Sequence, residues 1–120
     1  MRKDDKGRYR GLTLRVLGRG RPPAMGPGKA ELIERIAETG SISAAARAMG
    51  MSYRRAWQLV EALNAAYRGP VVVTAIGGER GGGARVTPLG RRLAAAFRAM
   101  ERKASAAIAA DLKRFTRQLR

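Results

Sequence analysis

The sequence contains neither cysteine nor histidine. These absences exclude disulfide bonds, metal sites built from thiolates or imidazoles, cysteine or serine–histidine nucleophiles, and histidine acid–base catalysis. We therefore expect a protein that is not an enzyme and that holds no cofactor or metal ion. No stretch approaches the roughly 20 apolar residues of a membrane helix, and no apolar segment follows residues 1–6. A cytoplasmic chain without membrane contact is expected.

Aromatic and acidic residues are also scarce. Aromatic residues make up 5% of the 120 residues, whereas apolar residues make up 45%, so the core must consist mainly of small and aliphatic side chains. Nine acidic residues face 25 lysines and arginines, which leaves a net charge of +16. The excess lies in residues 1–28 and 88–120, while residues 29–67 are nearly neutral. A field of this sign attracts polyanions, and nucleic acid is the first candidate.

The N-terminal part of the chain predicts a strand, a loop and three helices. Alternation of apolar residues predicts a strand over 12–17, and the Gly- and Pro-rich residues 18–28 predict a loop. Apolar residues at helical spacing predict a helix over 29–39 that ends at Gly40. Two further helices are expected over 44–49, capped by Ser43, and over 53–66, capped by Ser52.

The C-terminal part predicts a hairpin and one long helix. β-Branched residues predict a strand over 71–76, and a glycine-rich loop leads to a return strand over 84–86. Thr87 and Pro88 are typical of a helix start, as cap and first helical residue. Apolar residues then recur every three or four positions from Leu89 to Leu119, which predicts a helix about 45 Å long. Glu31, Glu34 and Glu38 are expected to form a solvated face of the first helix rather than a metal site.

Residues 43–64 fit a helix-turn-helix. Ala46 supplies a small residue where two helices touch, and Gly50 supplies a glycine four positions later in the turn. The start of the second helix would then meet base edges in the major groove, where arginine and glutamine suit guanine and adenine. The candidate DNA contacts of the two helices are Ser43, Ser52, Tyr53, Arg54, Arg55, Trp57 and Gln58. Trp57 has two interpretations, a DNA contact or a core residue, and we expect partial burial with one edge toward DNA.

The glycine-rich hairpin after these helices is typical of a wing. Arg80 and Arg85 would be its contacts to phosphates or the minor groove. The loop over 77–83 lacks the Lys-Ser/Thr ending of a P-loop, so a nucleotide-binding enzyme is disfavoured.

The residues resemble a known family at three places. These are residues 40–43, the segment Ser52-Tyr53-Arg54-Arg55-Ala56-Trp57, and the wing from Gly78 to Ala84 followed by Thr87-Pro88-Leu89-Gly90. Together they resemble the DNA-binding domain of the molybdate-responsive ModE regulators, over about residues 9–105, and the more distant LysR-type regulators share the Thr-Pro-x-Gly step. The resemblance implies a dimeric winged-helix repressor or activator. Molybdate or tungstate is implied as an effector, but the family's oxyanion-binding modules follow the long helix, and none is expected within these 120 residues.

The apolar stripe of the long helix has two interpretations, packing on its own domain or a dimer seam. A helix of this length cannot bury its whole stripe on so small a core, which favours a homodimer. The expected seam residues are Leu93, Phe97, Met100, Ile108, Leu112 and Phe115. The expected fold is mainly α with a small β wing, divided into a basic tail (1–8), a winged helix-turn-helix (9–87) and a long dimerisation helix (88–120).

The predicted function is that of a sequence-specific DNA-binding transcriptional regulator, acting as a homodimer on double-stranded DNA with a pseudo-palindromic operator and controlling molybdenum-related genes. The first alternative is a nucleoid-type architectural protein with little sequence preference. A basic RNA-associated protein is the second alternative, although the chain lacks the interleaved aromatics expected of one.

Overall fold

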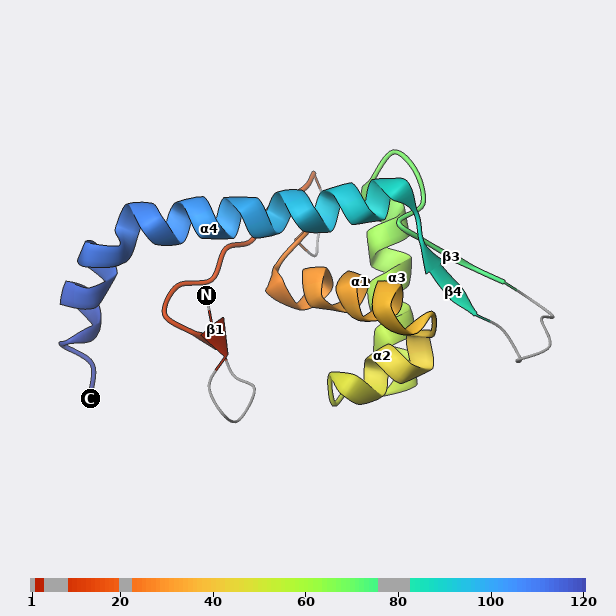
Figure 1. The fold of residues 1–120 in the computed structure, drawn as a ribbon, viewed down its shortest axis with the longest axis horizontal. Helices are drawn as coiled ribbons and strands as arrows, with labels where there is room; N and C mark the ends of the chain where they lie inside the picture. Colours follow the sequence, from red (N-terminus) through yellow and green to blue (C-terminus); the bar gives the residue numbers. More distant parts are fainter. Residues whose placement is uncertain (1, 4–8, 20–22, 76–82) are drawn as a thin grey trace.

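The structure is a computed structural model that describes residues 2–3, 9–19, 23–75 and 83–120. Figure 1 shows the shorter helices gathered under one end of a long helix, with a hairpin projecting beyond them. The helices are α1 (Pro27–Thr39), α2 (Ile42–Ala48), α3 (Tyr53–Ala66) and α4 (Pro88–Thr116). The hairpin pairs β3 (Val72–Thr74) with β4 (Ala84–Val86), and near the N-terminus β1 (Arg2–Lys3) pairs with β2 (Tyr9–Arg10).

Local sequence signals set the ends of the short helices. Pro27 occupies the first turn of α1, and Gly40 ends that helix with a left-handed φ of 68°. Helix α2 begins earlier than expected, because the Ser41 hydroxyl accepts a hydrogen bond from the amide of Ala44 (3.0 Å). The prediction that Ser43 caps this helix is therefore wrong, and Ser43 lies inside the first turn.

The core lies where α1, α2, α3 and the start of α4 meet. Its largest fully buried side chain is Phe97 of α4, and the others are aliphatic, as the shortage of aromatic residues predicts. The other large members are Leu32, Ile33, Ile36, Val60, Leu63 and Val71. Alanines at the α2–α3 contact are fully or almost fully buried, which lets these two short helices approach closely.

The predicted strand over 12–17 is wrong. This segment forms only an isolated bridge, in which the Val16 amide donates to the Met25 carbonyl (2.8 Å). Leu12 and Leu17 are exposed, and Leu14 is the member that packs partly on the core. The alternating pattern therefore has no sheet face to occupy, since no strand among the described residues continues the pairing.

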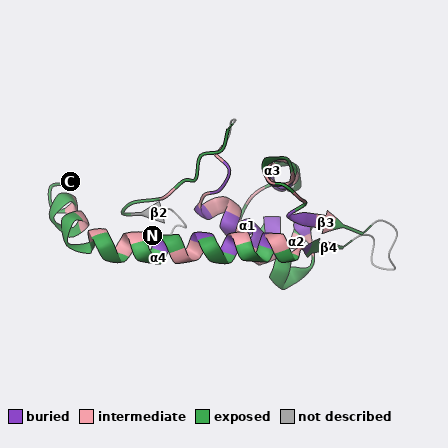
Figure 2. Ribbon diagram, turned by 90° about the horizontal axis from the view of Figure 1, so that it is seen from above, coloured by how far each residue is buried: buried purple, intermediate pink, exposed green. Residues whose placement is uncertain are grey.

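Helix α4 starts as predicted, because the Thr87 hydroxyl accepts from the Gly90 amide at 3.0 Å. Its 29 residues rise about 44 Å at 1.5 Å per residue. The first half packs on α1, and the second half extends beyond the domain with mostly exposed residues (Figures 1 and 2). None of the described helices is long and apolar enough to cross a membrane.

Arg98 joins the middle of α4 to α1. Its guanidinium donates to both carboxylate oxygens of Glu34 (2.7 and 3.0 Å) and to Glu101 (2.7 Å). The hydrogen bond with Glu34 is the largest influence that raises the pKa of Arg98 above its usual value. Glu34 was expected only to face solvent, so the sequence interpretation missed this link between residues 64 positions apart.

Candidate nucleic-acid interface

The start of α3 carries most of the predicted DNA contacts. The Ser52 hydroxyl caps the helix by accepting from the Arg55 amide (3.1 Å), as predicted. Beyond the cap, Tyr53, Arg54, Arg55 and Gln58 are all exposed. The opposite face of the helix, with Ala56, Val60 and Leu63, is buried. This division fixes which side of α3 faces outward.

The turn between α2 and α3 has the predicted geometry. Gly50 adopts a left-handed φ of 67°, which favours glycine over other residues. The amide of Met51 donates to the carbonyl of Ala46 at 3.0 Å, and Ala46 itself is buried. The two positions on which the helix-turn-helix prediction depends therefore perform the expected structural tasks.

Two aromatic residues are paired on α3, one turn apart. The rings of Tyr53 and Trp57 meet edge to face, with centroids 6.1 Å apart. Trp57 is partly buried against the core, whereas Tyr53 is 53% exposed. The structure thus agrees with partial burial of Trp57 and leaves Tyr53 accessible at the surface.

Asn64 connects the wing to α3, a role that the sequence analysis missed. Its side-chain oxygen accepts from the amides of Val71 and Val72 (2.8 and 3.0 Å), and its side-chain nitrogen donates to the Val72 carbonyl (2.9 Å). These bonds hold the start of β3 against the end of α3. An asparagine shortly before a Gly-Pro pair is a weak signal for such a bridge.

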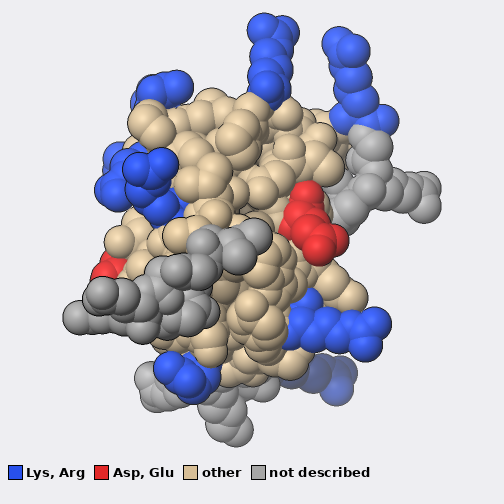
Figure 3. Space-filling view, turned by 90° about the vertical axis from the view of Figure 1, so that its right-hand side faces the viewer, with Lys and Arg blue, Asp and Glu red and all other residues tan. Residues whose placement is uncertain are grey.

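The remaining predicted contacts lie on α2 and the wing. Ser43 is exposed on α2, and Arg85 is exposed on β4, opposite Val73. Arg80 lies outside the described residues. Figure 3 looks onto the end of the molecule from which the hairpin projects, and most of its charged side chains are basic and stand around the rim of that face.

Among the described residues, the arginines of α3 and Arg85 have no acidic partner within ion-pair distance. Ion pairs among the described residues join Arg35 to Glu31, Arg98 to Glu34 and Glu101, and Arg114 to Asp111. None of them includes an arginine of α3 or Arg85, in the part of the chain that the structure describes. Free guanidinium groups on an exposed helix and on an adjacent wing suit a polyanionic partner.

The arrangement of three short helices, an exposed α3 and a two-stranded wing defines a winged helix-turn-helix domain. Residues 28–91 match the family described as bacterial regulatory helix-turn-helix protein, lysR family. The chain belongs to this family.

Individual relatives cover a larger part of the chain. The molybdenum-pterin-binding protein MopB of Rhodobacter capsulatus is 46% identical over 98 residues, which are 82% of this chain and 35% of that protein. The DNA-binding transcriptional dual regulator ModE of Escherichia coli (strain K12) is 40% identical over 67 residues, 56% of this chain and 26% of ModE. The chain thus spans about a third or less of these relatives' length. Among solved structures, ArgP from Mycobacterium tuberculosis matches with a TM-score of 0.50 and 28% identity over 71% of this chain and 31% of ArgP.

Proposed function

We propose that the chain recognises a specific DNA sequence through the start of α3. In this proposal α3 lies in the major groove and the wing contacts the backbone. The observation that carries the proposal is that Arg54, Arg55 and Gln58 are exposed in the first turns after the Ser52 cap. The two arginines form no ion pair with another described residue. Arginine and glutamine read guanine and adenine edges through paired hydrogen bonds. Such a regulator acts in the cytoplasm, where bacterial DNA lies.

We further propose that two copies pair through the distal half of α4. Met100 and Phe115 of this helix are 45% and 69% exposed, and such apolar side chains are the ones a second helix would cover. The proposed seam leaves out Phe97, which is buried in the protein's own core, and Leu93, which packs partly on that core. Leu112, which was also expected in the seam, lies beside Gly11 of the N-terminal segment. The proposed seam therefore begins near Met100.

The regulated genes are proposed to be related to molybdenum. The support comes from the names of the relatives, which include molybdenum-pterin-binding proteins and molybdenum transport proteins named ModE.

A two-fold symmetric dimer would read a pseudo-palindromic site with half-sites about one or two helical turns apart. We also propose that the effector of this regulator is molybdate or tungstate.

Competition binding tests sequence recognition. A labelled fragment from the gene's own upstream region is bound near physiological salt and challenged with excess unrelated DNA. We expect the wild-type complex to survive, and the double variant Arg54→Ala with Gln58→Ala to lose this preference while it keeps most of its non-specific affinity.

The matched control removes charge from the wing. Arg85→Ala should weaken binding to every sequence alike and reduce the salt dependence. A wild-type complex that unrelated DNA displaces readily would contradict sequence recognition and favour the architectural alternative. Equal losses on all sequences for the α3 double variant would reject α3 as the reading element.

A further inference from the structure

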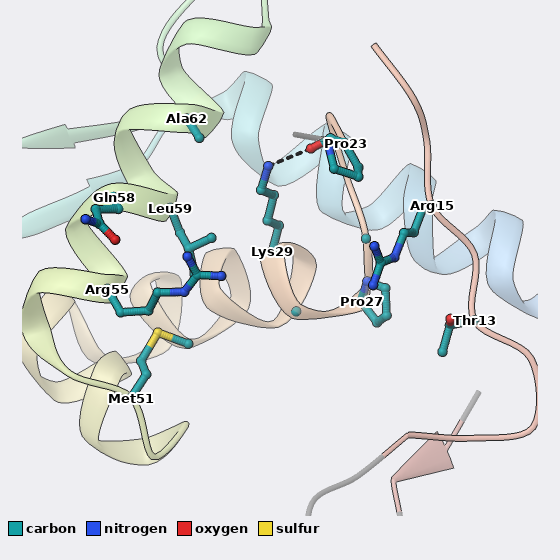
Figure 4. A pocket seen from close by; sticks show the side chains of 12 residues that line it. Thr13, Arg15, Pro23, Pro27, Lys29, Met51, Arg55, Gln58, Leu59 and Ala62 are labelled. Carbon is teal, nitrogen blue, oxygen red and sulfur yellow. Dashed lines mark hydrogen bonds between the residues drawn. The ribbon is translucent and has the colours of Figure 1, made fainter. Parts of the chain in front are cut away.

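A cavity of about 630 Å³ lies between the N-terminal segment, the start of α1 and α3. Its size is within the range of small-molecule sites, which span about 300–1,000 Å³. Figure 4 shows three cationic side chains, Arg15, Lys29 and Arg55, which reach the cavity from these three parts of the chain. No acidic residue lines the cavity, so this positive charge has no counterpart among the lining residues.

Lys29 is the most enclosed of these three cations, because Arg15 and Arg55 are exposed. Its ammonium group donates to the Pro23 carbonyl at 2.6 Å, which holds the side chain along the cavity wall. Burial lowers the pKa of Lys29, and the nearby charge of Arg55 lowers it further. Two cations that repel each other at a partly desolvated site are stabilised when an anion lies between them.

The backbone amides at the start of α1 add hydrogen-bond donors that, like the cations, attract negative charge. The cap of α1 is Gly26, which provides no side-chain hydrogen bond, and the first turn contains no acidic residue. The first amide groups of a helix have no partner within the helix and attract negative charge. A side chain built at Gly28, which also lines the cavity, would meet nothing within 4 Å.

We propose that this cavity binds one oxyanion group of the phosphate type, held between Lys29 and Arg55 with Arg15 at its edge. Two sources can supply that group. One is a backbone phosphate of the DNA bound by α3, since Arg55 and Gln58 face both the cavity and the predicted DNA surface. The other is a free small anion, whose apolar part would contact Met51 and Leu59. Only the DNA source rests on the proposed function.

The site is tested first without DNA. Inorganic phosphate is titrated into the 15N-labelled full chain at constant ionic strength, and the amide shifts of Gly28 and Lys29 are followed. For a free anion we expect a saturable response, weakened about tenfold or more in Lys29→Met, which removes one charge-assisted contact. Lys103→Met is the matched control, because it removes the same charge from an exposed position of α4 outside the cavity.

A second pair of variants covers a failure of Lys29→Met to fold. Gly28→Asp places a carboxylate at the start of α1, where it is compatible with the helix dipole, and it should occupy the site in place of phosphate. Gly28→Ala adds only a methyl group and should bind phosphate like the wild type.

Duplex binding in phosphate-free buffer is the second arm. If the occupant is a DNA phosphate, Lys29→Met and Gly28→Asp should weaken binding to all sequences well beyond the loss in Lys103→Met. Absence of saturable phosphate binding, together with duplex affinities of the cavity variants equal to that of Lys103→Met, would overturn the proposal. A wild-type chain that binds no duplex would contradict the proposed function, while the phosphate titration would still decide the cavity.

Discussion

Gly90 in the first turn of α4 provides a stringent test of how the wing and the long helix fit together. A Cβ atom at this position would lie 2.5 Å from the Val71 carbonyl oxygen and 2.8 Å from Cγ1 of Val86. Real Cβ atoms do not approach a backbone oxygen so closely, so Gly90→Ala must move α4 away from the base of the hairpin. The same Val71 carbonyl accepts from the Thr87 amide (3.0 Å), and the Thr87 hydroxyl donates to the Pro70 carbonyl (2.7 Å) beside it, and both bonds would be disturbed.

The expected magnitude follows from opposing effects. Alanine gains about 1 kcal/mol over glycine in a helix, whereas overpacking costs about 1–3 kcal/mol and each weakened hydrogen bond about 1 kcal/mol. We expect a net loss of about 2–4 kcal/mol for Gly90→Ala, which lowers the melting temperature by about 10 °C or more. Gly28→Ala is the matched control in α1, where nothing lies within 4 Å, and it should gain about 0.5–1 kcal/mol.

Urea and thermal unfolding followed by circular dichroism at 222 nm measure both variants. The protein concentration must be the same throughout, because dimerisation would add to apparent stability. If Gly90→Ala were as stable as Gly28→Ala, the close approach of α4 to Val71 and Val86 would be refuted. The steric reason for glycine in the Thr-Pro-x-Gly step would then fail with it.

Two further predictions concern the C-terminal helix and a partly buried tyrosine. Phe115→Glu should reduce the sedimentation mass to that of a monomer if the distal half of α4 is the seam, and an unchanged dimer mass would reject that seam. Tyr67 donates a hydrogen bond to the Ala24 carbonyl (2.8 Å), so Tyr67→Phe should cost about 1 kcal/mol at neutral pH. Burial raises the pKa of Tyr67, so its stabilisation is complete below about pH 10 and is lost as the pH rises through the folded-state pKa. Between about pH 8 and pH 10.5 the free energy of unfolding, measured by urea titration, should therefore fall less in Tyr67→Phe than in the wild type. An equal fall in the two proteins would contradict the stabilising hydrogen bond of Tyr67.

Elements with strong local signals were predictable from the sequence. The start of α3 was correct because Ser52 provides a cap by itself, β3 lies within the strand expected from β-branched residues, and the start of α4 follows from the Thr87-Pro88 pair. Gly40 was correctly expected to end the first helix and Gly50 to lie in the turn, and both adopt the left-handed backbone that such positions favour. The exposed residues at the start of α3 were located by the same local reasoning.

Features that depend on distant residues were not predictable in this way. Alternation over 12–17 suggested a strand, but a strand requires a neighbouring strand to pair with. Within this segment only Val16 forms a bridge to another described residue. Spacing placed Phe97 in the dimer stripe, yet α1, which is far from Phe97 in the sequence, packs on α4, and the ring is buried in the protein's own core. The cationic cavity is of the same kind, because Arg15, Lys29 and Arg55 are brought together only by packing.

The sequence by itself determined the charge of the protein, the order of its helices and the presence of a helix-turn-helix followed by a wing. These properties arise from composition, caps and turns, which act over a few residues. The tertiary structure alone decided how much of α4 remains exposed, how Asn64 and Arg98 connect elements, and which cations share a cavity. Those outcomes depend on contacts between segments far apart in the chain, which no local pattern records.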